Sequence, residues 1–333
     1  MTLEEIKALR NEPWREELRK AMSPKDRGAI ERVKMPELTP EYRVTTFTEE
    51  VQQGLTAEMA MCEAKRCLDC ADPSCMKGCP VGINIPTFVK HIEKGEFLEA
   101  AKTIKKTSSL PAVCGRVCPQ EKQCEGQCIK LKMKQKPVAI GYLERFAADY
   151  ERTSGNMQAP ECAAKNGKKV CVVGSGPSGL AFAADMVKFG YDVTVFEALH
   201  EIGGVLKYGI PEFRLPNSVV DAEINIMREM GVNFQPDVIV GKTVSYEQIH
   251  EMGFDGIFVG SGAGLPRFMN IPGENAIGVM SSNEYLTRIN LMGAGRGQGF
   301  DTPVLKGENV VVVGGGNTAM DSVRTAKRLG AER

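Results

Sequence analysis

Nine of the eleven cysteines lie between Cys62 and Cys128, and eight of these form two rows with short spacings. The first row reads Cys67-x2-Cys70-x4-Cys75-x3-Cys79-Pro80, and the second row contains Cys114, Cys118-Pro119, Cys124 and Cys128. Soft thiolates suit iron–sulfur cores, and short loops between cysteines let neighbouring sulfurs face one core. A Cys-Pro step at the end of a row is typical of ferredoxin-type ligation. Two rows of four cysteines therefore predict two [4Fe–4S] clusters.

Zinc is the alternative chemistry, because paired cysteines also form zinc knuckles. Zinc sites usually combine two spaced pairs or include histidine, and His91 is the single histidine in this window. In two-cluster ferredoxins the last cysteine of a row ligates the other cluster. That rule assigns the first three cysteines to one cluster and joins the fourth to two cysteines of the second row, in the sets Cys67, Cys70, Cys75 and Cys79, Cys118, Cys124. The three cysteines outside the two rows, Cys62, Cys162 and Cys171, are expected to be packing residues.

A glycine-rich turn follows a predicted strand at residues 170–173 and reads Gly174-Ser175-Gly176-Pro177-Ser178-Gly179. Gly174 permits a tight turn and Gly176 lets a pyrophosphate approach the backbone, while the following helix supplies N–H donors at its N-terminus. Glu197 ends the next predicted strand, at residues 192–196, where an acid that binds ribose is expected. A glycine turn with only a structural role is the alternative. The pattern predicts a dinucleotide site in a Rossmann-like fold.

A second glycine turn, Gly314-Gly315-Gly316-Asn317-Thr318-Ala319, follows a predicted strand at residues 309–313 and precedes another predicted helix. It fits the GxGxxA form of the dinucleotide motif. The tip of the next strand would distinguish NAD from NADP, and the sequence does not contain that strand, so both cofactors stay open. Two such turns predict two dinucleotides, typically a flavin and a nicotinamide.

The elements that must position these residues differ between the two halves of the chain. Helical periodicity covers residues 85–107 and 138–152, on either side of the second cysteine row, and a lysine-rich link spans residues 130–137. That link is either a solvated charged face or a docking site for an acidic electron carrier. Residues 154–168 lack periodicity and predict a domain boundary. Strand-helix-strand order then predicts a parallel sheet, with a further strand in residues 256–263.

Composition excludes several classes of protein. The 333 residues include 42 Lys and Arg and 42 Asp and Glu, and this balance gives no electrostatic case for a nucleic acid or an anionic membrane as partner. No apolar run approaches the roughly 18 residues of a spanning helix, and the charged N-terminus lacks the apolar core of a signal peptide. We expect a soluble cytoplasmic protein, where thiols stay reduced rather than forming a disulfide framework.

The order of these motifs resembles a known family. The cysteine rows are followed by GSGPSG, a glutamate-tipped strand, EIGGVLKYGIPEFRLP at residues 201–216, and GGGNTA. From about Glu41 onward the chain resembles the small subunit of NADPH-dependent glutamate synthase. It is also similar to the N-terminal half of dihydropyrimidine dehydrogenase and to the large subunit of ferredoxin:NADP transhydrogenases. The resemblance implies electron flow from NADPH to FAD, to two [4Fe–4S] clusters, and to a large catalytic subunit or another acceptor.

The resemblance also implies roles for individual residues. Flavin-contacting positions match Gly203, Gly204, Leu206 and Arg214, with Val240 as a further cofactor contact. The nicotinamide-dinucleotide loop matches Gly315, Gly316, Asn317 and Thr318. Cys128 is implied as the fourth ligand of one cluster, and a polar ligand at Glu144 completes the other and leaves Cys114 unbound. The residues alone favour Cys114, so both candidates stay open. No catalytic acid, base or nucleophile is expected, and His200 beside Glu201 is read as a loop position near the flavin.

We therefore predict an α/β protein with an N-terminal all-helical double-cluster domain at residues 1–155. A Rossmann-like FAD domain at residues 165–280 and the start of an inserted Rossmann-like NAD(P) domain at residues 281–333 follow. Family members continue beyond this point, and one strand with one helix cannot bury its faces alone, so a fragment or a truncated product is expected. The alternative function is a non-catalytic, cluster-bearing electron-transfer or scaffold fragment without nicotinamide binding. The motifs do not indicate the final electron acceptor or the oligomeric state.

Overall fold

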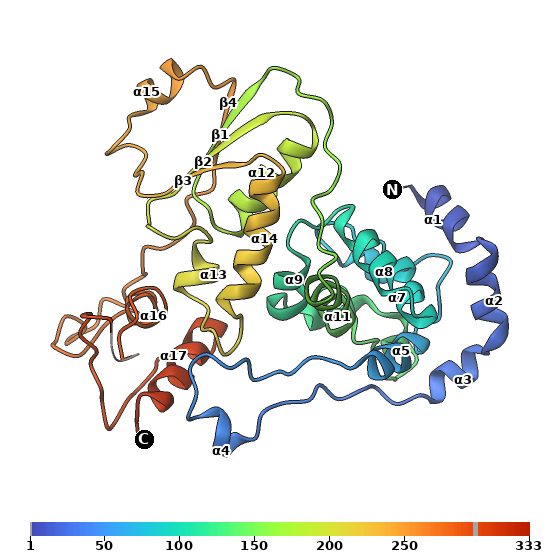
Figure 1. Ribbon diagram of the computed structural model, residues 1–333. Coiled ribbons are helices and arrows are strands. Elements are labelled where there is room, and N and C mark those ends of the chain that lie inside the picture. Colours follow the sequence, from blue (N-terminus) through green and yellow to red (C-terminus); the bar gives the residue numbers. More distant parts are fainter. Residues whose placement is uncertain (1, 296–298) are drawn as a thin grey trace. The chain divides into compact units, whose positions relative to one another are not determined.

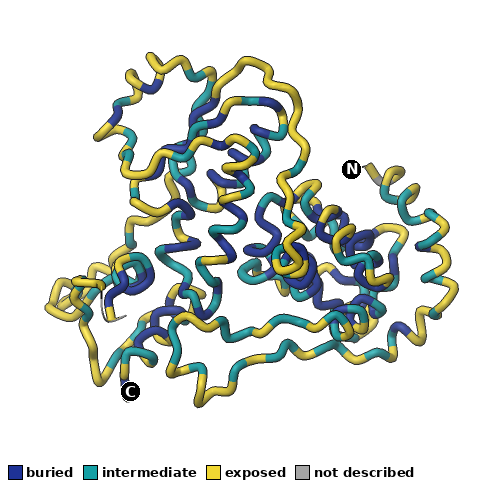
Figure 2. The backbone as a smooth tube through the Cα atoms, viewed as in Figure 1, coloured by how far each residue is buried: buried dark blue, intermediate teal, exposed yellow. Residues whose placement is uncertain are grey.

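The computed structural model describes residues 2–295 and 299–333, and the chain forms two compact units (Figure 1). Unit 1 comprises Met1–Glu37 and Gln52–Gln158, and unit 2 comprises Leu38–Val51 and Ala159–Arg333. Each unit buries apolar residues of its own, and the backbone at buried residues is dark blue in Figure 2.

Unit 1 is built from short helices that surround the cysteine rows. In chain order they are α1 (Leu3–Arg10), α2 (Pro13–Ala21), α3 (Pro24–Ala29), α5 (Ala57–Lys65), α6 (Ser74–Lys77), α7 (Ile85–Lys94), α8 (Phe97–Lys105), α9 (Pro111–Val117), the 3-10 turns η1 (Gln120–Lys122) and η2 (Glu125–Gln127), α10 (Ile129–Lys132) and α11 (Ile140–Thr153). The periodic stretch at residues 85–107 forms two helices rather than one. Gly95, in a left-handed conformation with φ of 87°, ends α7 and lets the chain turn into α8.

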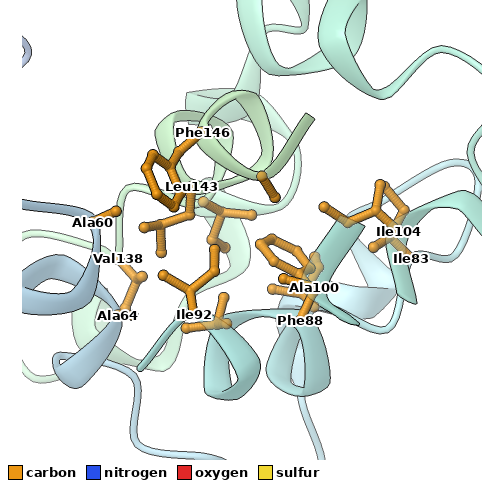
Figure 3. Packing of buried hydrophobic residues seen from close by; sticks show 14 of the residues in the cluster. Ala60, Ala64, Ile83, Phe88, Ile92, Ala100, Ile104, Val138, Leu143 and Phe146 are labelled. Carbon is orange, nitrogen blue, oxygen red and sulfur yellow. The ribbon is translucent and has the colours of Figure 1, made fainter. Parts of the chain in front are cut away.

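The core of unit 1 forms where α7, α5 and α11 meet. Asn84 caps α7 by accepting the Thr87 N–H, and the helix then buries Phe88 and Ile92 on one side. These side chains pack with Leu143 of α11 and with small residues of α5, as Figure 3 shows. Several cysteines of both rows pack against the same apolar cluster, so the core that stabilises the unit also encloses the candidate ligands.

Unit 2 contains a four-stranded parallel sheet in the order β3-β2-β1-β4. The strands are β1 (Lys169–Val173), β2 (Asp192–Phe196), β3 (Asn233–Gln235) and β4 (Gly256–Val259). The helices are α4 (Pro40–Arg43), α12 (Pro177–Lys188), α13 (Val205–Tyr208), α14 (Asn217–Glu229), α15 (Tyr246–Glu251), α16 (Ser282–Asn290) and α17 (Asn317–Arg328). The crossover helix α12 joins two adjacent parallel strands, so the predicted parallel α/β architecture is confirmed.

Two predicted strands differ from the structure. The run at residues 256–263 is a strand only as far as Val259. Residues 309–313 form no strand, and Val311 and Val313 are exposed. A strand is held by ladder hydrogen bonds to a neighbour, and in the described ranges no strand lies alongside this segment.

The predicted first domain also differs at one internal segment, because residues 38–51 belong to unit 2 rather than to the helical unit. The Val51 N–H donates to the Phe213 carbonyl at 2.8 Å, and Arg328 Nε donates to the Thr46 carbonyl at 2.8 Å. The Arg328 guanidinium also lies 3.6 Å from the centroid of the Phe213 ring. These contacts attach the segment to α17 and to Phe213, which lies between α13 and α14. Across residues 2–295 and 299–333, no helix has both the length and the apolar character needed to span a bilayer.

Candidate cluster and dinucleotide sites

Four cysteines line one apolar cavity in unit 1, and they are Cys67, Cys70, Cys75 and Cys128. The rest of the lining includes Ile85 and Val89 of α7 and Val138 and Ile140 at the start of α11. Cys79, which the ferredoxin rule places with the second row, does not line this cavity. The structure thus brings Cys128, the candidate taken from the family resemblance, to the first three cysteines.

The chemistry of this cavity fits an iron–sulfur core. Burial raises the pKa of Cys67, raises that of Cys70 to about 11, and places that of Cys75 well above its usual value. Isolated thiolates are therefore disfavoured there. Metal ligation requires thiolates, and the positive charge of bound iron would offset the cost of burying them.

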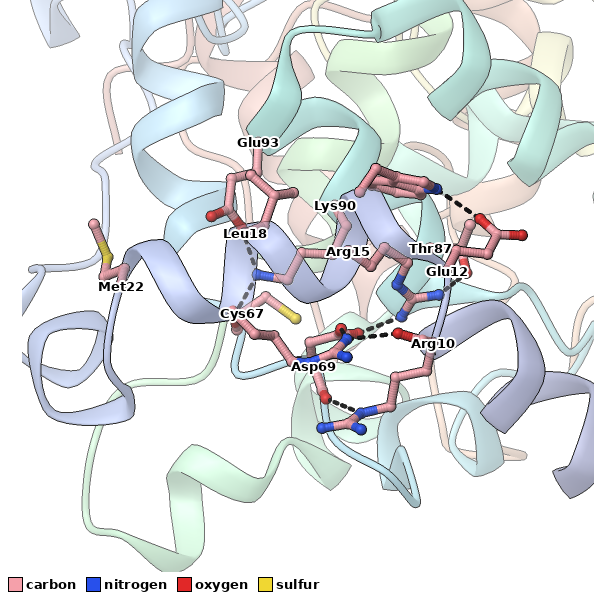
Figure 4. Close-up of polar contacts among 12 residues, drawn as sticks. Arg10, Glu12, Arg15, Leu18, Met22, Cys67, Asp69, Thr87, Lys90 and Glu93 are labelled. Carbon is pink, nitrogen blue, oxygen red and sulfur yellow. Dashed lines mark hydrogen bonds and ion pairs between the residues drawn. The ribbon is translucent and has the colours of Figure 1, made fainter.

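The loop between Cys67 and Cys70 is held by arginines of the N-terminal helices (Figure 4). Asp69 is fully buried and has a left-handed backbone with φ of 52°. Its carboxylate accepts hydrogen bonds from Arg15 and, at 2.7 Å, from Arg19, and its carbonyl accepts from Arg10 Nε at 2.7 Å. Lys90 Nζ donates to the Cys67 carbonyl at 2.8 Å. Sequence reasoning missed this clamp, because nothing local relates those arginines to the cysteines.

The second group of candidates gathers near α9 and α11. Burial raises the pKa of Cys124 to about 12, and the charges of Glu125, Glu144 and Cys79 act in the same direction. A hydrogen bond from the Cys114 thiol lowers the pKa of Cys118. The two open candidates therefore differ in their surroundings: Cys114 interacts with Cys118, and Glu144, which is 5% exposed, interacts with Cys124.

Two glycines permit the close approaches that bring these groups together. A Cβ on Gly78 would lie 2.7 Å from the Gln123 carbonyl oxygen, so this glycine lets the end of the first row approach the second. A Cβ on Gly115 would lie 2.5 Å from the Arg145 nitrogen, where α9 crosses α11. Both positions directly precede or follow a candidate ligand. A glycine next to a candidate ligand is visible in the sequence, but the sequence-based prediction did not consider it.

The three cysteines outside the two groups have different surroundings. Cys171 is buried inside β1, as expected for a packing residue, whereas Cys62 and Cys162 are exposed and do not pack in a core. Of the side chains described in the two ranges, no three from His, Cys, Asp and Glu converge closely enough to hold a single metal ion.

The first glycine turn lies at the carboxyl end of β1. Gly174 has φ of 98°, and its N–H donates to the Phe196 carbonyl at 2.8 Å. A Cβ on Gly179 would lie 2.0 Å from the Gly174 carbonyl oxygen, so α12 packs tightly on the turn. A Cβ on Gly176 would meet no described heavy atom within 4 Å. Gly176 therefore borders open space at the N-terminus of α12, and this arrangement fits a dinucleotide pyrophosphate.

Glu197 connects this turn to the end of β2. Its Oε2 accepts hydrogen bonds from the Ser175 N–H at 2.8 Å and from Ser175 Oγ at 2.5 Å, and Oε1 accepts from the Leu199 N–H at 3.0 Å. Glu197, the acid expected to bind ribose, is only 6% exposed. Its hydrogen bonds to Ser175 also order the glycine turn. Pro177 and Ser178 form the first turn of α12, and Gly176 is its N-cap.

Two of the residues assigned to the flavin by resemblance lie directly at this turn. The Gly203 N–H donates to Ser175 Oγ at 2.9 Å, and a Cβ on Gly204 would lie 2.8 Å from the Gly176 Cα. Leu206 is buried in α13, and Val240 packs partly buried against the core beside Cys171. Arg214 Nη1 forms a 2.6 Å ion pair with Asp321 of α17.

The second glycine turn precedes α17. Gly314 has φ of 132°, and Cβ atoms on Gly315 and Gly316 would meet no described heavy atom within 4 Å. Asn317 and Thr318 begin α17, and the Thr318 carbonyl accepts a hydrogen bond from Ser322 Oγ at 2.9 Å. The turn is therefore open, as a phosphate-binding loop must be, although no strand pairing supports it in the described residues.

Comparison with known families follows this division of the chain. A family model described as dihydropyrimidine dehydrogenase domain II, 4Fe-4S cluster, matches residues 43–156. A second model, described as pyridine nucleotide-disulphide oxidoreductase, matches residues 168–333. The first match contains both cysteine rows and Glu144, and the second contains both glycine turns.

Proteins of similar sequence support the same two-domain assignment. The small chain of NADPH glutamate synthase is 37% identical over 301 residues in Halomonas elongata, covering 89% of this chain and 62% of that protein. The Escherichia coli K12 small chain is 36% identical over 305 residues, covering 91% of this chain and 64% of that protein. The Escherichia coli K12 subunit PreT of NAD-dependent dihydropyrimidine dehydrogenase is 36% identical over 290 residues, covering 86% and 66%.

The chain is a homologue of glutamate synthase small chains, with a 4Fe-4S cluster domain followed by a pyridine nucleotide-disulphide oxidoreductase domain.

The two domain matches and the relatives confirm the predicted resemblance, the fold class and the cofactor set of [4Fe–4S] clusters, FAD and NAD(P). This chain spans about two thirds or less of the length of the relatives that it matches. Helices α1–α3, which carry the arginine clamp, precede the residues that the cluster-domain model matches.

Proposed function

We propose that this small-chain homologue transfers electrons from NADPH, through FAD and two [4Fe–4S] clusters, to a partner protein. The observation that carries the proposal is the convergence of Cys128 with Cys67, Cys70 and Cys75 on one apolar cavity. These four thiols would hold the first cluster. Cys79, Cys118 and Cys124 would hold the second, with Glu144 or Cys114 as its fourth ligand.

The glycine turn after β1 would hold the FAD pyrophosphate. Gly176 leaves room for the phosphates, and the backbone N–H groups at the start of α12 would donate to them. Glu197 fixes Ser175 and, through Ser175 Oγ, the Gly203 N–H, so one acid orders both segments of the expected flavin site. FAD supplies the exchange between a hydride and single electrons, and the protein supplies orientation.

Gly315, Gly316, Asn317 and Thr318 would hold the nicotinamide dinucleotide at the start of α17. The names of the relatives support a separate catalytic chain as the electron acceptor, since glutamate synthase small chain and dihydropyrimidine dehydrogenase subunit PreT both denote parts of larger enzymes. We also propose that the protein is cytoplasmic and that NADPH is its electron donor.

A cluster-bearing protein without nicotinamide binding is the second candidate. It is favoured by one observation: the segment before the second glycine turn is unpaired with any strand of the described chain, and Val311 is 88% exposed. Stopped-flow bleaching of the flavin by NADPH separates the two functions. Saturable bleaching supports the electron-transfer chain, and a flavin that NADPH does not bleach supports the second candidate.

Elemental analysis tests the cluster assignment. Anaerobically prepared protein is expected to carry about eight irons with matching acid-labile sulfide, as two cubane clusters require. Cys128→Ser should lower the iron content by about half, whereas Cys162→Ser, at an exposed cysteine outside both groups, should leave it unchanged. Stoichiometric zinc without sulfide would contradict the assignment.

A further inference from the structure

A lysine-rich loop begins directly after Cys128. Residues 129–137 read Ile-Lys-Leu-Lys-Met-Lys-Gln-Lys-Pro, and no acidic residue occurs between Cys128 and Glu144. Ile129 and Lys130 line the same cavity as the four cysteines, so the loop forms part of the cavity wall. The charge of this loop is therefore adjacent to the expected first cluster.

The inner side of the loop is anchored to buried groups. Arg66, which is 2% exposed, donates to the Lys136 carbonyl at 2.6 Å and to the Pro137 carbonyl at 2.8 Å. Lys130 turns inward and donates to the Arg27 carbonyl at 3.2 Å and to Gln135 Oε1 at 3.1 Å. These bonds hold the backbone in one conformation. The loop is thus a preorganised part of the unit rather than a free linker.

The outer side of the loop presents five exposed residues, called here the lysine face: Leu131, Lys132, Met133, Lys134 and Lys136. Leu131 and Met133 are 44% and 46% exposed, and lysines flank them. An apolar centre with a charged rim is typical of a protein interface, and a flexible methionine suits an adaptable contact.

Lys134 occupies a backbone position that glycine would fill with less strain. Its φ of 57° is left-handed, and the Gln135 N–H returns to the Lys130 carbonyl at 2.9 Å, as in a glycine-terminated helix end. The loop therefore presents a lysine at a position where backbone conformation alone favours glycine. Replacing Lys134 by glycine would therefore remove the charge of the side chain without straining the backbone.

We propose that the lysine face docks an acidic, one-electron carrier protein beside the cavity of Cys67, Cys70, Cys75 and Cys128. The inference rests on the proposed function, since it names the surface and the charge of the partner. Three exposed lysines without a neighbouring acid in the loop attract an acidic surface and accelerate its encounter. The lysine face follows directly after Ile129 and Lys130 of the cavity wall, so a carrier docked on it would lie close to the expected cluster.

The test is calorimetric titration of the iron-loaded 333-residue chain with an oxidised acidic [2Fe–2S] ferredoxin, at low and at high salt. Binding is expected at low salt and weaker at high salt, and basic cytochrome c should not bind. Lys132→Gln, Lys134→Gln and Lys136→Gln combined should weaken ferredoxin binding about tenfold, as three exposed charge pairs contribute modestly. The same change at Lys94 of α7, Lys102 of α8 and Lys106, the C-cap of α8, is the matched control and should have little effect.

Lys134→Gly separates docking from folding. It should raise or preserve the melting temperature, because glycine suits the left-handed position, yet weaken ferredoxin binding. Unchanged binding in the triple variant, or equal binding of both carriers, overturns the proposal. Preferential binding of the loop to anionic phospholipid vesicles overturns it as well. Failure of the proposed function is distinguishable, because it would appear as missing iron or as flavin that NADPH does not bleach, whatever the binding result.

Discussion

Asp69 and Arg15 form a buried ion pair that joins the loop between two candidate cluster ligands to helix α2, and neither side chain is more than 2% exposed. Arg19 of the same helix forms a second ion pair with Asp69. Charges this deeply buried are tolerated only when paired and hydrogen-bonded. The shape of the Cys67–Cys70 loop therefore depends on residues fifty or more positions earlier in the chain.

Replacing Asp69 should destabilise unit 1 strongly. Asn accepts the left-handed backbone, so Asp69→Asn removes the charge and leaves Arg15 buried without its counterion, at a cost of about 3–5 kcal/mol. Asp72→Asn, two residues after this loop, is the matched control, because Asp72 is exposed and pairs with exposed Lys77, and it should cost less than about 1 kcal/mol. Urea unfolding measures both, and equal losses would contradict the buried role of Asp69.

Gly176 and Gly179 should respond differently to the same substitution. Gly176→Ala places a methyl in open space, so stability should change by less than about 0.5 kcal/mol while FAD binding is lost. Gly179→Ala forces a methyl against the Gly174 carbonyl and should cost roughly 1–3 kcal/mol. Flavin titration and thermal unfolding distinguish the two effects. FAD binding at wild-type strength in Gly176→Ala would exclude the pyrophosphate from this position.

The fourth ligand of the second cluster can be identified by paired substitutions. If Glu144 ligates, Glu144→Ala should alter the electron paramagnetic resonance signal of one reduced cluster, and Cys114→Ser should leave both signals intact. The neighbourhood of Glu144 and Cys124 makes the first outcome our expectation. The reverse pattern would make Cys114 the ligand.

Iron removal should make the stability of unit 1 sensitive to alkaline pH. Burial raises the pKa of Cys70 to about 11, above the ordinary 9.0 of an exposed thiol, so the folded state favours the neutral form. A raised folded pKa gives stability that is full below pH 9 and is lost as pH rises toward 11. In the iron-loaded protein the ligands are already thiolates, and this loss should be absent. Thermal unfolding at pH 8 and pH 10, with and without iron, measures the difference, and parallel pH slopes would refute it.

Elements with strong local signals were predictable from the sequence. The apolar run of β1, the glycine turn, α12 and β2 each carry their own pattern, and the structure places all four as expected. The segment at residues 309–313 has the same kind of pattern but forms no strand. Backbone pairing depends on a neighbouring strand, which local composition does not report.

The sequence by itself determined the chemistry of this protein. The rows of cysteines, whose thiolates are soft ligands, specify iron–sulfur clusters, and the glycine turns specify dinucleotides. Ligand type and turn geometry are local properties of the chain. Only the tertiary structure decided which cysteines share a cavity, since Cys128 joins Cys67, Cys70 and Cys75 across more than fifty residues. It also decided that Asp69 is neutralised by α2 and that Gly78 permits the two rows to meet. These relationships arise from packing between distant segments, where volume and burial, rather than spacing along the chain, select the partners.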